Sequence, residues 1–168
     1  MSSQNDKFVR AYEQMLERSK SFLTEAGHKV APKLDAAIEA AKEKAADLGE
    51  LTLEESEKIA EYLKRDLHDA AEFLADDSNE LRQWLRFDIE LVENRIFDAL
   101  SLLVDHTKVD LAEFAEQAQR FGEWHTGEIT SPGTLVCKDC GEVLHFHKTG
   151  HIPPCPKCHA TAYRRATD

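Results

Sequence analysis

Two closely spaced pairs of cysteines near the carboxyl end constrain this chain more than any other feature. Each pair has the spacing C-x-x-C, at residues 137–140 and 155–158, and fourteen residues separate the pairs. Two intervening residues allow a tight turn that places both sulfurs on one side. A β-hairpin that brings two such turns together would set four sulfurs at the tetrahedral positions that zinc prefers. The spacing therefore predicts one structural zinc ion, with the ligands Cys137, Cys140, Cys155 and Cys158.

The four cysteines could also form a redox motif or an iron site instead of a zinc site. A single C-x-x-C is also typical of thioredoxin-like redox motifs, whereas two of them with a turn-forming interval are typical of zinc sites. The pair C-x-x-C-G and C-P-x-C also resembles the rubredoxin ligand set, which would make the chain an iron-containing electron carrier. The short interval and the few aromatic residues nearby favour zinc. Four thiolates leave no open coordination position, so we expect the metal to fold the region and not to catalyse.

Four of the eight histidines lie in the same region, and the sequence does not assign them a role. They are His145, His147, His151 and His159. His159 follows the second cysteine pair where Gly141 follows the first, at a position that usually requires a positive φ, so we expect some strain there. Its alternative role is that of a substitute ligand for Cys158. His145 and His147 would share one face of a strand, either as water-exposed side chains or as ligands of a second metal.

Composition and charge divide the chain near residue 126. Four of the five prolines follow residue 130, where short stretches at 134–136 and 143–147 favour strands and residues 148–151 favour a turn. Residues 1–125 contain 16 Lys and Arg against 28 Asp and Glu, while residues 126–168 contain 5 against 4. We therefore expect an acidic helical domain at 1–125 and a four-cysteine zinc ribbon at 126–168. An acidic domain repels phosphate backbones, which argues against nucleic-acid binding by that half.

Apolar residues in the first domain recur at steps of three and four, which predicts amphipathic helices. The expected helices span about residues 5–26, 32–49, 52–75, 78–105 and 107–122. Thr52 and Glu55 form a capping-box pair, and Ser78 is the expected cap of the fourth helix. The fold class is therefore mainly α: a helical bundle or coiled-coil hairpin followed by a small C-terminal β zinc ribbon. The stripe containing Trp84, Leu85 and Ile96 would also allow a homo-oligomer through the helices.

Several function classes lack support in the sequence. It contains no H-E-x-x-H, G-x-S-x-G, P-loop or dinucleotide-binding motif, so we do not expect an enzyme. It has neither a secretory signal pattern nor an apolar stretch long enough for a bilayer, and the polar helix faces are acidic, so we expect no membrane association. We expect a cytoplasmic protein, in which cysteines stay reduced and suit metal ligation.

Several stretches together resemble a bacterial family of zinc-ribbon proteins of unknown function. They are residues 49–52, 65–67, 125–129, 135–137, 155–158 and 164–165, and they span nearly the whole chain. The resemblance implies a cytosolic zinc-binding protein with an acidic helical half and no established activity. Only the four cysteines carry over with a role. His159 departs from the family, in which many members have glycine at this position.

These observations favour a non-enzymatic interaction protein, in which the helical scaffold presents the zinc ribbon to a macromolecular partner. We expect that partner to be a protein, with Arg164, Arg165 and Tyr163 at the contact, since Arg and Tyr are enriched at interfaces. The alternative is a nucleic-acid-, ribosome- or transcription-associated factor that contacts RNA or DNA through the ribbon. Tyr163 and Phe146 would alternatively cover the zinc-binding turns, because so small a region has little other core.

Overall fold

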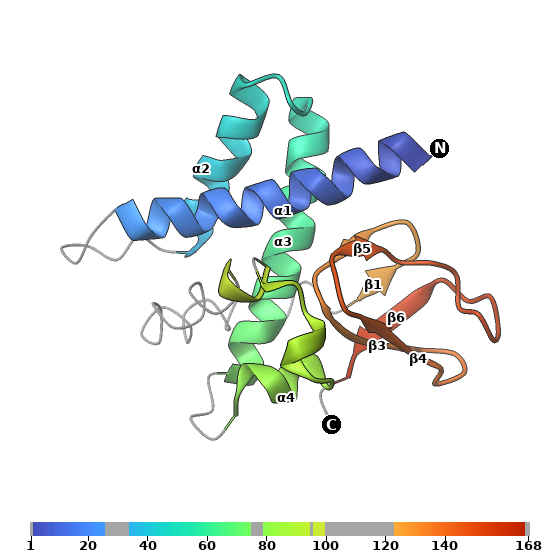
Figure 1. Cartoon of the computed structure of the whole chain (residues 1–168). Helices are drawn as coiled ribbons and strands as arrows, with labels where there is room; N and C mark the ends of the chain where they lie inside the picture. The colour runs from blue at the N-terminus through green and yellow to red at the C-terminus, as the bar shows by residue number, and fades with distance from the viewer. Residues whose placement is uncertain (1, 26–33, 75–78, 95, 100–122, 167–168) are drawn as a thin grey trace.

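Three long helices form a bundle in the amino-terminal part of the chain. The computed structural model describes residues 2–25, 34–74, 79–94, 96–99 and 123–166. The helices are α1 (Ser2–Glu25), α2 (Leu34–Asp47) and α3 (Leu53–Leu74). Figure 1 shows α1 crossing α3, with α2 packed beside both. Their apolar stripes meet in one buried cluster that includes Met15, Leu16, Ile38, Ile59 and Leu63, so the first three predicted helices are confirmed.

Local signals in the sequence explain where α2 ends and α3 begins. Gly49 has a φ of 68°, and the backbone N–H groups of Gly49 and Glu50 donate to the carbonyls of Ala46 and Ala45, as in a Schellman motif. The predicted capping box is present. The Glu55 N–H donates to Thr52 Oγ1 at 3.1 Å, and the Thr52 N–H donates to the Glu55 carboxylate at 2.9 Å.

The prediction of one continuous helix over residues 78–105 is wrong. Helix α4 (Leu81–Leu85) ends at Arg86, which has a φ of 65°, and a 3-10 turn η2 (Ile89–Leu91) follows. The break folds the apolar stripe back onto α3, where Trp84, Leu85 and Val92 are buried against Ala70. The apolar period predicted a continuous helix, but packing of these side chains against α3 determines the conformation instead. The expected cap Ser78 and the predicted helix at 107–122 lie outside the described residues.

The same stripe was also expected to be available for contact with a second copy of the chain. The side chains of Trp84, Leu85 and Ile96 are all fully buried inside the chain. They therefore do not form an exposed surface for self-association. None of the helices among the described residues has the length and apolar character needed to cross a membrane.

The carboxyl-terminal part is a small antiparallel β structure. Its strands are β1 (Trp124–His125), β2 (Ile129–Thr130), β3 (Gly133–Cys137), β4 (Val143–Phe146), β5 (Gly150–His151) and β6 (Ala162–Arg165). One sheet has the order β1-β6-β3-β4, and β2 pairs with β5 separately. The hairpin β3–β4 confirms the strands predicted from residues 134–136 and 143–147. The sheet includes Trp124 and His125, two residues before the expected boundary at 126.

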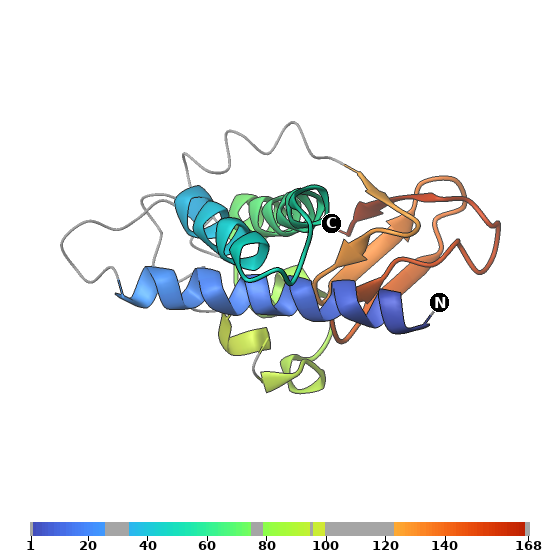
Figure 2. The ribbon, with the colours of Figure 1, turned by 90° about the horizontal axis from the view of Figure 1, so that it is seen from above.

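The ribbon is packed against the helices. Figure 2 shows its strands beside α1 and α3. Ile129 of β2 is buried in the same apolar cluster as the bundle, and His151 Nε2 lies 3.1 Å from the carbonyl oxygen of Asn5 in α1. The ribbon therefore supplies part of the helical core.

Candidate metal centre

The sheet brings the two cysteine pairs together at one end of the ribbon. Cys137 is the last residue of β3, and the second pair lies between β5 and β6. The Sγ atoms of Cys137 and Cys158 are 3.6 Å apart, and those of Cys140 and Cys155 are 3.5 Å apart. All four sulfurs lie within 4.8 Å of one another. A zinc tetrahedron with bonds of about 2.3 Å has sulfur–sulfur edges of about 3.8 Å, so the geometry suits a structural zinc ion.

The two metal-binding turns have the same backbone geometry. The Gly141 N–H donates to the Cys137 carbonyl at 3.0 Å, and the His159 N–H donates to the Cys155 carbonyl at 2.9 Å. Gly141 has a φ of 77° and His159 a φ of 63°. The expected positive φ at His159 is therefore confirmed. It disfavours a side chain by about 1–2 kcal/mol relative to the right-handed conformation.

The electrostatics of the cluster favour a bound cation. Burial opposes ionisation of Cys155, but the N–H groups of Cys158 and Lys157 bring the pKa of this thiol down to about 7. The N–H of Ala160 stabilises a thiolate at Cys158, yet burial and the neighbouring sulfurs raise the pKa of Cys158 to about 12. Four adjacent sulfurs therefore do not ionise together unaided. A zinc ion would supply the positive charge that holds all four as thiolates.

Tyr163 covers the zinc-binding turns and does not form part of an exposed surface. Its side chain is fully buried in a cluster with Trp124, Leu135 and Cys155, and its hydroxyl donates to the Pro153 carbonyl at 2.8 Å. The alternative covering role of Tyr163 is confirmed. Its expected role at a partner contact is wrong, because the small ribbon uses this aromatic ring as core.

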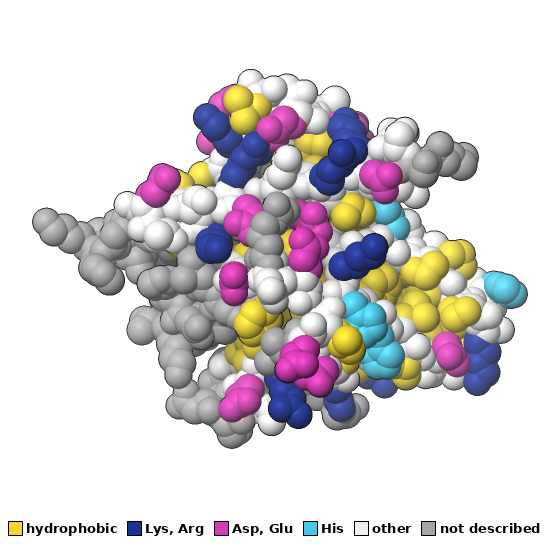
Figure 3. Space-filling model, in the orientation of Figure 1, with side chains coloured by type: hydrophobic (Ala, Val, Ile, Leu, Met, Phe, Trp, Pro, Cys, Tyr) yellow, Lys and Arg dark blue, Asp and Glu magenta, His cyan; other side chains and the backbone are white. Residues whose placement is uncertain are grey.

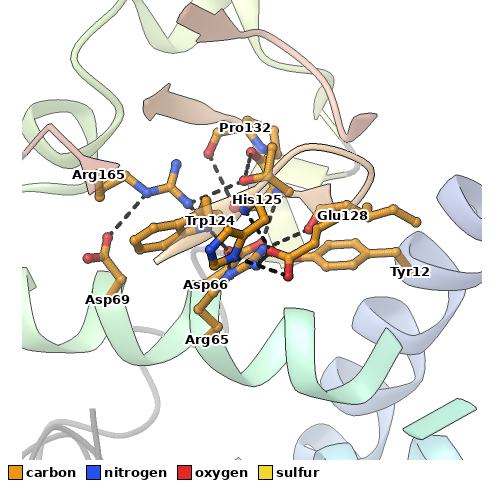
Figure 4. Close-up of polar contacts among 12 residues, drawn as sticks. Tyr12, Arg65, Asp66, Asp69, Trp124, His125, Glu128, Pro132 and Arg165 are labelled. Atoms are coloured by element: carbon orange, nitrogen blue, oxygen red, sulfur yellow. Dashed lines mark hydrogen bonds and ion pairs between the residues drawn. The ribbon is translucent and has the colours of Figure 1, made fainter. Parts of the chain in front are cut away.

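A second polar constellation, centred on Asp66 of α3, joins the ribbon to the helices (Figure 4). Asp66 is fully buried. Its carboxylate accepts hydrogen bonds from the Tyr12 hydroxyl at 2.6 Å, the Trp124 Nε1–H at 2.8 Å and the Ser131 N–H at 2.9 Å. Arg65 Nε donates to it at 3.1 Å. We call this set, together with Arg165, the Asp66 cluster.

Arg165 enters the Asp66 cluster from the last strand and is almost completely buried. Its guanidinium lies 3.5 Å from Asp66 and 3.3 Å from Asp69, and it stacks 4.8 Å from the ring centres of both Trp84 and Trp124. Ion pairing and cation–π stacking compensate the desolvation of this charge. The expectation that Arg165 lies at an exposed partner contact is therefore wrong, whereas Arg164 is exposed.

Arg65 completes the connection from the helical side. Its guanidinium donates to the Glu128 carboxylate at 2.5 Å and to the Ile129 carbonyl at 2.8 Å. Gly133 is required nearby, because a Cβ at this position would clash with the Arg165 guanidinium. Sequence reasoning missed the Asp66 cluster. The available signal was the position of Asp66, three residues after Leu63 on the buried stripe of α3, where a charged residue needs buried partners.

The matched turns lead to a prediction about stability. We expect His159→Gly to stabilise the zinc-loaded protein by about 0.5–1 kcal/mol, since glycine removes the strain of a positive φ but gains entropy in the unfolded chain. Gly141→Ala is the matched control. A Cβ there meets no atom within 4 Å, so only backbone strain of about 1–2 kcal/mol should act, in the destabilising direction. Thermal unfolding of both variants checks this. Stabilisation by both substitutions, or by neither, would contradict the assigned geometry.

Comparison with known proteins identifies relatives of this chain. The chain is 28% identical over 81 residues to a protein of Escherichia coli strain K12 described as uncharacterized protein YbeL, and it matches the proteins of the same description in strains CFT073 and O157:H7 equally well. The match covers 46% of this chain, which spans about half the length (48%) of these relatives. No solved structure shows a significant match.

A family model extends the comparison to most of the chain. The model described as a zinc-ribbon containing domain matches residues 21–167, which include α2, α3, the whole ribbon and all four cysteines. Together with the clustered sulfurs, this match identifies a structural zinc ion as the metal of the site. The chain belongs to the family of proteins with this zinc-ribbon containing domain.

Proposed function

We propose that this protein is a non-enzymatic interaction protein, in which the acidic helical bundle presents the zinc ribbon to a protein partner. The observation that carries the proposal is the Asp66 cluster. Asp66 accepts hydrogen bonds from Trp124 and Ser131 of the ribbon, and Arg65 donates to the Ile129 carbonyl. These buried contacts hold the ribbon in one orientation on the helices. A ribbon held in this way is a preorganised surface, which loses little conformational entropy when a partner binds.

The charges of the ribbon favour a protein partner over nucleic acid. Of its five cationic side chains, Arg165 is buried, Lys138 is paired with Glu123 and Lys157 is 4.0 Å from Glu142. Of these five, only Lys148 and Arg164 are exposed and have no carboxylate partner among the described residues. Tight non-specific nucleic-acid binding draws on several phosphate contacts, so two free cations offer little for it.

The exposed face of the sheet offers a surface for such a partner. Arg164 on β6 pairs with Val136 on β3, which pairs in turn with Val143 on β4. Paired residues of neighbouring strands project from the same face, so these three side chains form a row across the sheet. Val143 is 44% exposed, Val136 is half-buried and Arg164 is exposed. An apolar pair beside an arginine is a combination enriched at protein interfaces.

This proposal predicts a specific loss of binding. Zinc-loaded protein immobilised as bait should capture a host protein, and Arg164→Ala should weaken the purified complex about tenfold or more, because arginine is a frequent hot-spot residue. Arg82→Ala is the matched control, since Arg82 is an exposed arginine on α4 and not on a strand of the sheet. Equal weakening by both variants would contradict the assigned face. Micromolar or tighter binding to RNA or DNA with a steep salt dependence would favour the nucleic-acid alternative instead.

A further inference from the structure

A groove separates the ribbon from the segment that follows α4. Its volume is about 760 Å³. Residues 145–151 form one wall and residues 90–94 form the other, so His145 and His147 face a segment that carries Glu90 and Glu93. Figure 3 shows histidines beside acidic side chains on this face of the molecule. Imidazole and carboxylate groups are the ligands that divalent transition-metal ions use in proteins.

The hydrogen bonds around His145 indicate which ring nitrogen carries the proton of the neutral imidazole. The buried Thr134 hydroxyl is 2.8 Å from the Leu85 carbonyl and 3.0 Å from His145 Nδ1. A carbonyl only accepts, so the single hydroxyl proton goes to Leu85, and the Thr134 oxygen accepts from Nδ1–H of His145. The proton of the neutral ring is therefore on Nδ1, and Nε2 keeps its lone pair on the side away from Thr134. Metal-ligating histidines are oriented in this way by a partner on the other ring nitrogen.

His147 lines the same groove as His145. It is two residues after His145, just past the end of β4, so the two Cα atoms are about 7 Å apart along an extended chain. Both rings make edge contacts with Phe87, at centroid distances of 6.1 Å for His145 and 4.7 Å for His147. Both side chains are exposed. Two imidazoles two residues apart on an exposed chain segment can chelate one ion.

We propose that His145 and His147 form a second, exchangeable site for a divalent transition-metal ion, separate from the four-cysteine site. Within the described part of the chain, only the four cysteines form a ready set of three or more ligands. The second ion would therefore be bound by the two imidazoles, with water at the remaining positions. Two imidazoles bind an ion more weakly than four thiolates do, so this ion would exchange with ions in solution.

The chain offers a matched control in His151. This histidine also lines the groove, but its Nδ1 lies 3.2 Å from the Gly127 carbonyl and its Nε2 lies 3.1 Å from the Asn5 carbonyl. Both nitrogens face acceptors, so neither offers a lone pair to an ion in the groove. Loss of His151 should therefore leave metal binding at this site unchanged.

Calorimetric titration of the zinc-loaded protein with Ni²⁺ tests the proposal, with zinc content measured afterwards. We expect one Ni²⁺ to bind per chain while one zinc is retained. His145→Ala and His147→Ala should each weaken Ni²⁺ binding more than tenfold, and His151→Ala should not. Thr134→Val removes the partner of Nδ1 and should weaken binding about 10-fold, the usual effect of losing such a partner. Absence of Ni²⁺ binding, or equal affinity in wild type, His145→Ala and His147→Ala, would overturn the proposal.

Discussion

Replacing Asp66 with Asn is expected to destabilise the protein by about 3–5 kcal/mol, the usual cost of removing one partner from a buried ion pair. The carboxylate accepts from Tyr12, Trp124 and Ser131, and it is paired with Arg65 and Arg165. An amide has the same shape but only one accepting oxygen. Its NH₂ group would face some of these donors, and two guanidinium charges would stay buried with less compensation.

The two tryptophans provide a direct measurement of this effect. Trp84 and Trp124 are the only tryptophans in the chain, and both stack on Arg165. Urea unfolding followed by tryptophan fluorescence therefore reports on the Asp66 cluster itself. Asp139→Asn is the matched control, because Asp139 is an exposed side chain in the first metal-binding turn, and its stability should change by less than about 0.5 kcal/mol. Similar midpoints for the two variants would show that the Asp66 cluster does not hold the ribbon to the helices.

Loss of zinc is expected to unfold the ribbon and to weaken the helical bundle. A structural zinc ion contributes about 10–16 kcal/mol of binding free energy that is coupled to folding, so Cys140→Ser and chelator-treated wild type should both lose the ribbon. The bundle then loses Ile129 from its core, and Asp66 loses the hydrogen bonds that Trp124 and Ser131 donate to it. We expect the urea midpoint of the helical circular-dichroism signal to fall in both cases.

A combined variant separates this coupling from a general loss of stability. If the Asp66 cluster transmits the effect of zinc to the helices, zinc removal should lower the helical midpoint less in Asp66→Asn than in wild type. An unchanged helical midpoint in Cys140→Ser would instead support the simpler view of two independent modules.

The sequence predicted those features that depend on short, local patterns. The zinc-binding turns follow from two C-x-x-C pairs, the start of α3 follows from Thr52 and Glu55, and the strained turn follows from His159 in the place of a glycine. Each of these rests on residues within a few positions of one another, where backbone geometry leaves few alternatives.

The features that were missed depend on contacts between distant segments. Arg165 was expected at an exposed partner contact because arginine is enriched at protein interfaces. Its burial depends on Asp66, which lies 99 positions earlier, and on the rings of Trp84 and Trp124. The break after Leu85 was missed for a similar reason, since a regular apolar period continues through it. Only the packing of Trp84 and Leu85 against α3 shows why the chain turns there.

X-ray absorption at the metal edge of the purified protein tests the structural zinc site most directly. We predict one zinc ion per chain, surrounded by four sulfur neighbours at about 2.3 Å, because the four cysteines alone complete a tetrahedral shell. Iron in place of zinc, or a shell in which nitrogen or oxygen replaces one of the four sulfurs, would contradict the assignment of Cys137, Cys140, Cys155 and Cys158 as its ligands.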